Sequence, residues 1–194
     1  MKKVLALLLS LLLALSFCAC KSKKENSASG ADIEQYVKIG QIPESGYKLK
    51  DNVDEALKKM KAEYKPDDMD GHSGEEEAQA ELPVFENGEY TEIMCGDFQY
   101  YYNTEKKDSG ISAIVSFSKA FGFEADTVSV EVVNGLKSRG IDAELKKGTL
   151  NDYYFLSFGS DECEYITYSV NGNTAVFVFV ESRLSAAAVY VNDL

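Results

Sequence analysis

The chain has 194 residues, a formal net charge of −12 at pH 7 and a sequence pI of about 4.6. This acidic balance argues against nucleic-acid binding, because the phosphate backbone would repel the protein. The length fits one globular domain, and no motif indicates a bound cofactor.

The first segment has the order typical of an export signal. Lys2 and Lys3 precede an uncharged, leucine-rich run over residues 4–17, and the small residue Ala19 stands directly before Cys20. The run is shorter than the about 20 apolar residues that a membrane-spanning helix needs, and it fits a signal peptide. In this order of residues the segment resembles the signal peptides of bacterial lipoproteins.

The resemblance implies that residues 1–19 are removed and that Cys20 receives lipid on its sulfur. Cys18 is the alternative acceptor, and an ordinary secretory signal cut near Ala19 is the alternative reading of the segment. Two or more lipid chains hold a protein stably at a membrane. We therefore expect an extracytoplasmic protein that is lipid-anchored to the bacterial cell membrane.

Composition divides the remainder into three parts. Residues 20–50 are expected to be the lipid anchor and a flexible tether, residues 51–81 a short helix and an acidic linker, and residues 82–194 the globular domain. Asn52 and Glu55 fit a capping box at the start of the helix. Its apolar residues recur at helical spacing: Val53, Ala56, Leu57, Met60 and Tyr64.

Strand patterns dominate the rest of the chain. Residues 89–94 and 97–103 predict a hairpin, and residues 111–117 predict a further strand. Residues 126–139 fit either a strand or a helix. We favour the helix, because Asp126 can cap its start and Gly140 its end.

Three further runs predict strands, over residues 152–158, 164–170 and 174–180. Asn171-Gly172 between the last two is a strong hairpin signal, since both turn positions need a positive φ. Residues 174–180 are apolar on both faces, which indicates a central strand. The tail from Arg183 fits a short helix or a closing strand.

Together these elements predict an α+β fold, in which one or two helices pack on a mostly antiparallel sheet of five or six strands. Two cysteines remain in the body, Cys95 and Cys163. Outside the cytoplasm they can form a disulfide, and the alternative is a pair of buried thiols.

The motifs of common catalytic and metal sites do not occur. His72 is the only histidine, and a calcium loop built around Gly71 would place Pro66 at its first ligand position. The acids Asp161 and Glu162 are adjacent and would point apart on a strand, although glycoside hydrolysis needs two converging carboxyl groups. We therefore expect no metal site and no catalytic residue.

Tyrosines are the remaining unusual feature of the sequence. Tyr100, Tyr101 and Tyr102 lie on a predicted strand, so alternate members face opposite sides. An exposed tyrosine is a common binding anchor; the alternative is that tyrosine simply favours strands. The leading hypothesis is a non-enzymatic module that binds a protein or a glycan at the cell surface. An envelope hydrolase acting through paired carboxylates and an accessory subunit of an envelope complex remain the alternatives.

Overall fold

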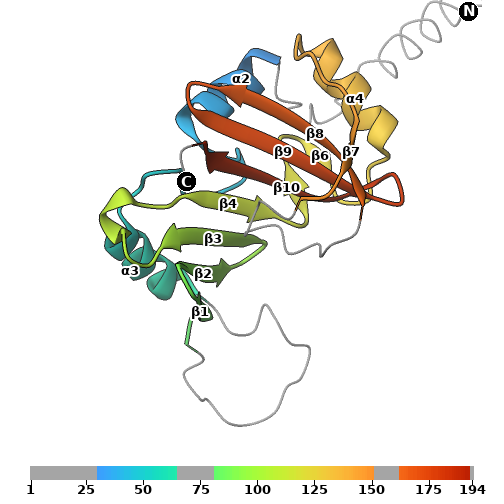
Figure 1. Ribbon diagram of the computed structural model, residues 1–194. Helices are drawn as coiled ribbons and strands as arrows, with labels where there is room; N and C mark the ends of the chain where they lie inside the picture. The colour runs from blue at the N-terminus through green and yellow to red at the C-terminus, as the bar shows by residue number, and fades with distance from the viewer. Residues whose placement is uncertain (1–29, 65–80, 151–161, 193–194) are drawn as a thin grey trace, which may run out of the picture.

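The computed structural model describes residues 30–64, 81–150 and 162–192. These residues form an α+β fold with a large antiparallel sheet, as the sequence predicts (Figure 1). Within them, three α-helices occur: α2 (Gly30–Ile39), α3 (Val53–Glu63) and α4 (Ser129–Ser138). None of the helices in these ranges has the length and apolarity that crossing a membrane requires.

The sheet consists of two four-stranded meanders that meet at its centre. Its strand order is β1-β2-β3-β4-β10-β9-β8-β7, and every pairing is antiparallel. The sheet is wider than the five or six strands expected, because short edge strands complete both meanders and the tail is a strand. The strands of the first meander are β1 (Val84–Asn87), β2 (Tyr90–Cys95), β3 (Phe98–Asn103) and β4 (Ala113–Ser116). Those of the second are β7 (Lys146–Gly148), β8 (Cys163–Val170), β9 (Asn173–Val180) and β10 (Arg183–Val191).

Three shorter features complete the described chain. The strands β5 (Lys119–Ala120) and β6 (Phe123–Glu124) form a separate small hairpin, and a 3-10 turn covers Lys107–Ser109. The strand predicted over residues 152–158 lies outside the described residues.

The strongest local signals in the sequence are confirmed. Strands β2 and β3 form the expected hairpin, and Asn171 and Gly172 have φ angles of 55° and 79° in the turn between β8 and β9. Residues 173–179 are all buried, and β9 lies between β8 and β10 inside the sheet. Asn52 begins α3, where its Oδ1 accepts a hydrogen bond from the Glu55 backbone N–H at 3.0 Å.

The helix predicted near residues 126–139 is confirmed as α4, but its start differs from the expectation. Asp126 has φ 65°, and the residue at the N-cap is Val128, which makes no side-chain capping bond. Val128 also forms an isolated antiparallel bridge with Arg183. Gly140, with φ 79°, follows the last turn as predicted.

The expected tether over residues 20–50 is wrong for the part that the structure describes. In α2, Ile33 and Val37 are fully buried, and Ile42 and Leu49 of the segment that follows are buried in the same cluster. Asn173 of β9 donates hydrogen bonds from Nδ2 to the carbonyl oxygens of Val37 and Lys38, at 3.1 and 3.2 Å, and thus satisfies the end of α2. The folded body therefore includes α2 and α3 and does not begin near residue 82.

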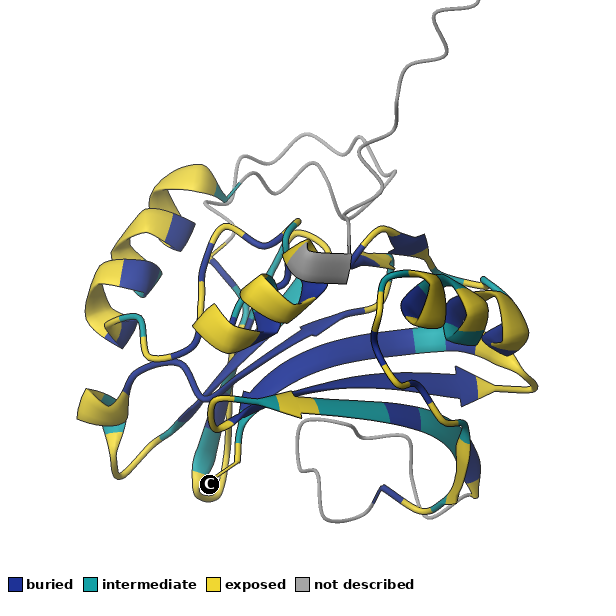
Figure 2. Ribbon diagram, turned by 90° about the horizontal axis from the view of Figure 1, so that it is seen from above, coloured by how far each residue is buried: buried dark blue, intermediate teal, exposed yellow. Residues whose placement is uncertain are grey.

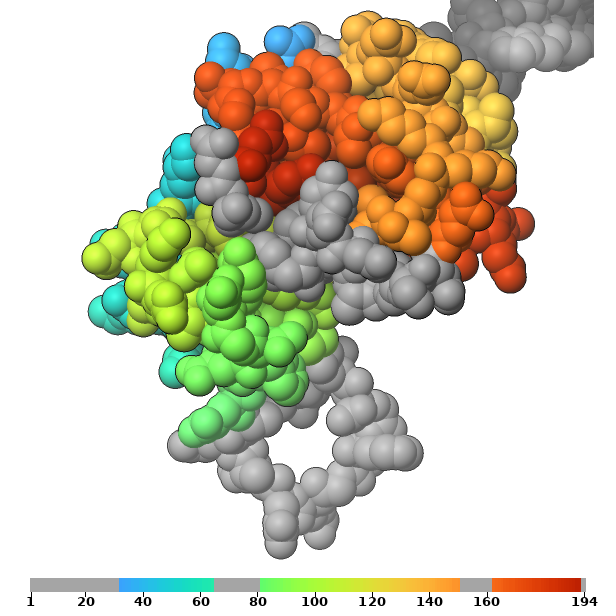
Figure 3. All heavy atoms as spheres, in the orientation of Figure 1, coloured from blue at the N-terminus to red at the C-terminus, as the bar shows by residue number. Residues whose placement is uncertain are grey.

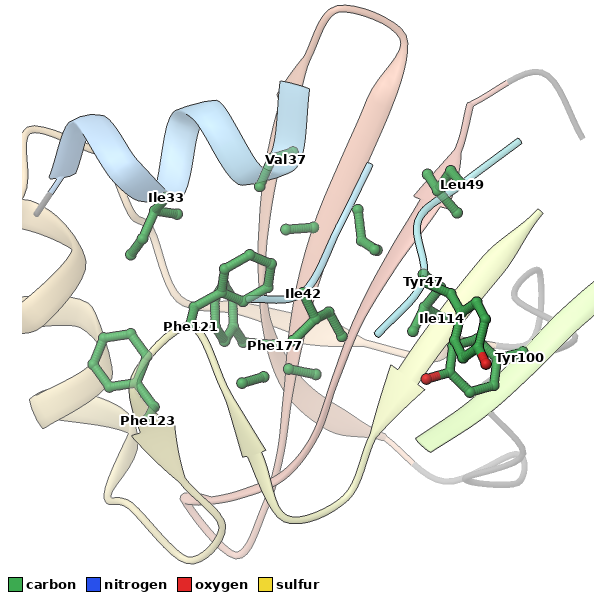
Figure 4. Close-up of a cluster of buried hydrophobic side chains, with 14 of the residues drawn as sticks. Ile33, Val37, Ile42, Tyr47, Leu49, Tyr100, Ile114, Phe121, Phe123 and Phe177 are labelled. Atoms are coloured by element: carbon green, nitrogen blue, oxygen red, sulfur yellow. The ribbon is translucent and has the colours of Figure 1, made fainter. Parts of the chain in front are cut away.

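All three helices contribute to the cluster on one face of the sheet. Figure 2 shows them on the same side, with buried residues turned toward the strands. In β9, Phe177 and Phe179 point to this helix-covered face, whereas Val176 and Val178 belong to a second cluster. Phe177 meets Phe121 and Phe123 at centroid distances of 5.6 and 6.0 Å at the centre of the first cluster (Figure 4).

Candidate functional site

The three consecutive tyrosines do not form an exposed face. Tyr100, Tyr101 and Tyr102 retain only 2%, 6% and 7% of their accessible surface. Tyr100 and Tyr102 pack in the helix-covered cluster, and Tyr101 packs in the cluster on the opposite face. The expectation of an exposed tyrosine surface is wrong, because both faces of β3 are covered.

Cys95 and Cys163 are free thiols rather than a disulfide. Cys95 ends β2, whereas Cys163 begins β8, and β3, β4, β10 and β9 lie between these strands. At about 4.8 Å per strand spacing, the two strands are roughly 24 Å apart, far beyond the reach of a disulfide. The two thiols also belong to opposite faces of the sheet.

Several sequence-based candidates lie outside the described residues, namely Cys18, Cys20, His72, the acidic loop around Gly71, and Asp161. Glu162 is described and exposed. Among the residues that the structure does describe, no three His, Cys, Asp or Glu side chains lie close enough together to hold a metal ion.

A groove with a volume of about 490 Å³ lies beside the turn between β2 and β3. Three separate segments form it: the stretch between α2 and α3, the C-terminal end of α3, and the β2–β3 hairpin. We call it the acidic aromatic groove; its lining is Glu44, Gly46, Tyr47, Glu63, Tyr64, Cys95, Gly96, Asp97, Phe98 and Tyr100.

The base of the groove is a fixed pair of tyrosines. The rings of Tyr47 and Tyr100 lie side by side, nearly perpendicular, with centroids 5.3 Å apart (Figure 4). The hydroxyl oxygens of Ser45 and Tyr100 are 3.3 Å apart, and the Ser45 hydroxyl also donates to the Tyr47 carbonyl oxygen at 2.8 Å. Burial holds both rings in place, and the contact with Ser45 also fixes the Tyr100 hydroxyl.

The two aromatic walls of the groove are more accessible. Phe98 and Tyr64 are half-buried, and the Phe98 ring is tilted by 37° against Tyr100 at a centroid distance of 6.2 Å. Phe98 lies on β3 and Tyr64 directly follows α3. The walls thus come from two elements that both pack on the helix-covered cluster, so the spacing between them is set by the fold.

Three exposed carboxylates, those of Glu44, Glu63 and Asp97, line the same groove as these rings. Glu44 accepts hydrogen bonds from the backbone N–H groups of Phe121 and Gly122, each at 3.2 Å. Glu63 accepts a long hydrogen bond, 3.5 Å, from the Tyr47 hydroxyl. Asp97 lies in the turn between β2 and β3.

The groups around Glu63 titrate at unusually high pH. Burial raises the pKa of Tyr47 to about 12, and the negative charge of Glu63 adds to that effect. Burial, with Glu63 as the second cause, also raises the pKa of the Cys95 thiol. Burial raises the pKa of Tyr100 as well, against a smaller opposing effect of its hydrogen bond with Ser45. Phenols and thiol are therefore neutral near pH 7, and the charge of the groove is that of its carboxylates.

Two other hollows lie on the described part of the chain. One of about 400 Å³ is lined by Lys147, Glu164 and Ser182, but Glu164 already accepts contacts from the other two, at 3.4 and 3.0 Å. Another of about 480 Å³ lies beside β1 and shares Tyr64 with the acidic aromatic groove. The first of these is internally paired, and the second adjoins the groove.

The groove could hardly be predicted from the sequence, because the residues that line it are far apart in the chain. Glu44 and Tyr47 lie in a segment that composition assigns to a tether, and Phe98 and Tyr100 are ordinary strand residues. The only available signal was that Tyr64 and Glu63 end a credible helix. A comparison with protein-family models, with curated proteins and with solved structures finds no significant match.

Proposed function

We propose that the protein is a lipid-anchored, extracytoplasmic binding module that captures a protein or a glycan at the bacterial cell surface. The N-terminal segment that ends in Ala19 and Cys20 supports the anchor, since it resembles a lipoprotein signal. The acidic aromatic groove supports the binding role, and it is the proposed ligand site.

The observation that carries this proposal is that two half-buried aromatic side chains, Phe98 and Tyr64, line the same groove as the buried pair Tyr47 and Tyr100. Aromatic side chains with accessible ring area and little freedom to move are typical binding anchors. Tyr47 and Tyr100 in the same lining are almost completely buried, so this part of the groove is preorganised. Preorganisation lowers the entropy cost of binding.

Binding fits the groove better than hydrolysis. A glycosidase of the usual kind needs a protonated carboxylic acid opposite a second carboxylate. Both carboxylate oxygens of Glu44 accept backbone N–H groups, from Phe121 and Gly122. This acid is therefore held by the protein itself, which suits a fixed contact group better than a residue that faces a glycosidic bond.

A second candidate function, an accessory subunit of an envelope complex, is favoured by the edge strand β1. All four of its residues are exposed, among them Val84 and Phe85 at 40% and 53%. An exposed strand edge can pair with an extended segment of another protein. This site is separate from Phe98, so one pair of variants distinguishes the two functions.

The test is a thermal-shift screen of the full chain against cell-wall fragments, glycans and peptides, repeated on Phe98→Ala and Phe85→Ala. A ligand of the native state raises Tm in a concentration-dependent way. The groove predicts that Phe98→Ala abolishes the shift and Phe85→Ala keeps it. The reverse result would favour the accessory-subunit function. If no probe shifts the parent chain, the proposed capture of small fragments fails.

The anchor is tested separately by fractionation of bacteria that express the full chain. We expect Cys20→Ala to release the protein from the membrane fraction and Cys18→Ala to leave it there. Release by Cys18→Ala alone would move the lipid acceptor to Cys18. Retention of both variants in the membrane fraction would contradict a lipid anchor at either cysteine.

A further inference from the structure

We infer that the acidic aromatic groove recognises a primary alkylammonium group, presented as a lysine side chain in an exposed segment of a partner protein. This inference rests on the proposed binding function and names the chemistry of its ligand. It is carried by the joint presence of aromatic rings and unbalanced carboxylates around one cavity of about 490 Å³.

The rings supply one half of the recognition. A cation is attracted to the face of an aromatic ring when it lies within about 6 Å of the ring centroid. Phe98 and Tyr64 offer accessible ring area, while Tyr47 and Tyr100 form the base at right angles to each other. A cation that enters the groove can therefore meet the accessible rings of Phe98 and Tyr64, while the buried rings of Tyr47 and Tyr100 support the groove from within.

The carboxylates supply the other half. Glu44, Glu63 and Asp97 line the groove, and its described lining holds neither lysine nor arginine. The ion pairs found among the described residues use other acids, with Lys107 on Asp54, Lys119 on Glu124 and Lys147 on Glu164. A cationic ligand would thus meet negative charge that these ion pairs do not neutralise.

The titration of the neighbouring groups agrees with a negative field inside the groove. After burial, Glu63 is the next largest cause of the raised pKa of both Tyr47 and Cys95. A bound ammonium group would oppose this field. The net charge of −12 for the whole chain adds a long-range attraction for cations.

The form of the groove favours lysine over a more compact cation. The methylene stem of lysine packs along apolar surface while its ammonium group stays with polar partners. In this groove the methylene stem can pack against the rings of Phe98 and Tyr64, and the ammonium group can pair with the carboxylates of Glu63 and Asp97. An amino sugar carries its charge directly on a hydroxylated ring and has no methylene stem to pack against these rings.

The experiment is a calorimetric or NMR titration of the full chain with Nα-acetyl-lysine amide. Its neutral analogue, Nα-acetyl-norleucine amide, has a similar stem without the charge. We expect roughly millimolar binding of the lysine amide, as is common for a single small contact group, and no measurable binding of the norleucine amide. Raising the salt concentration should weaken binding.

Two variants locate the site, and one matched variant controls for net charge. Glu63→Gln should weaken binding about tenfold, because a charge-assisted contact is lost, and Phe98→Ala should weaken it at least as much. Glu144→Gln removes the same charge from an exposed position before β7, at the far edge of the sheet, and should leave binding unchanged. The Tm of each variant shows whether the fold is retained.

Four results would overturn the inference. Equal binding of the two amides would show that charge is not recognised, and an equal loss in Glu144→Gln would show that only net charge matters. Tighter binding of glucosamine than of the lysine amide would assign the groove to a glycan amine. If a neutral ligand from the screen binds and Phe98→Ala abolishes that binding while no amine binds, the ammonium assignment fails and the binding module stands.

Discussion

The two meanders of the sheet follow one plan. Strands β1 to β4 come after α3, strands β7 to β10 come after α4, and the last strand of each set lies at the centre of the sheet. There β4 and β10 pair antiparallel, with Val115 opposite Ala188. In Figure 3 the green surface of β1 to β3 lies at the opposite end of the molecule from the yellow and orange surface of α4.

The two meanders differ most between their inner and outer strands. All of β4, nearly all of β9 and most of β10 are buried, whereas every residue of β1 is exposed and β2 and β8 are only partly buried. Phe177 of β9 packs against Phe121 and Phe123 of the small hairpin, whereas the acidic aromatic groove lies beside the β2–β3 turn of the first meander. The comparison teaches that burial is concentrated in β4, β10 and β9, and ligand access at the outer end of the first meander.

The largest expected effect tests this separation directly. Phe177→Ala removes a fully buried ring and should lower the free energy of unfolding by about 3–5 kcal/mol. Phe85→Ala, the same substitution on β1 at 53% exposure, should change it by less than about 0.5 kcal/mol. Urea denaturation measures both. Similar losses in the two variants would contradict an uneven distribution of stability.

A second pair of variants tests the contact between the segment before β4 and the segment before α3. Gly110 has φ 78°, and a β-carbon there would lie 2.6 Å from the backbone carbon of Lys50. The segments meet through hydrogen bonds from Lys50 N to Ile111 O, 2.8 Å, and from Ile111 N to Asp51 O, 3.1 Å. Gly110→Ala should therefore destabilise the protein by about 1–3 kcal/mol from backbone strain, and more if the segments separate.

Gly88→Ala is the matched control for the close approach at Gly110. Gly88 also has a positive φ, 62°, but a β-carbon there would meet no atom within 4 Å. Its cost should be only the left-handed conformation, about 1–2 kcal/mol. If the midpoints of urea denaturation fall equally in the two variants, the close approach at Gly110 contributes nothing.

The third prediction concerns alkaline pH and belongs to the first meander. The pKa of Tyr47 is raised to about 12 by burial and by Glu63, and burial also raises the pKa of Tyr100. Between pH 10 and 12 the unfolded chain has lost these protons while the folded chain retains them. Stability is therefore complete below pH 10 and falls as the pH rises, by at most about 1.4 kcal/mol per pH unit for each phenol.

The measurement is the urea midpoint at pH 9, 10, 11 and 12 for the parent chain and for Tyr47→Phe. The variant lacks the phenol and should lose less stability over this range than the parent. Identical slopes would show that Tyr47 does not ionise more readily in the unfolded chain. Tyr90→Phe provides the control, since Tyr90 is half-buried on β2 and does not line the groove.

Local patterns predicted the inner strands of both meanders better than they predicted α2. Asn171-Gly172 specifies the turn between β8 and β9 by backbone conformation alone, and the apolar run of β9 specifies burial on both faces. By contrast, Ile33 and Val37 are separated by polar residues, and their burial depends on β9, which is more than 130 residues away. A short helix of mixed composition has no stability of its own to reveal it.

The groove could not be predicted from the sequence, because it too depends on contacts between distant parts of the chain. Alternation along β3 shows that Tyr100 and Tyr101 face opposite sides, but not that both sides are covered. Burial on each face depends on elements that are distant in the chain, and so does the meeting of Tyr47 with Tyr100. Sequence spacing carries periodicity, whereas a site assembled from three segments depends on tertiary contacts.

The smallest expected effect compares the starts of the two helices that precede the meanders. Asn52 caps α3 with its side chain, and Val128 begins α4 without a side-chain cap. Asn52→Ala should lower the free energy of unfolding by about 1 kcal/mol, because an N-terminal N–H of the helix loses its partner. Val128→Thr keeps the shape of the side chain and adds a capping oxygen, so it should raise stability by roughly 0.5 kcal/mol.

The urea midpoints of the two variants separate two explanations for the uncapped start of α4. A higher midpoint for Val128→Thr, together with a lower one for Asn52→Ala, would show that a side-chain cap stabilises α4 when one is supplied. No gain would instead mean that the bridge between Val128 and Arg183 already fixes the start of α4, and that tertiary pairing there takes the place of the local signal that α3 uses.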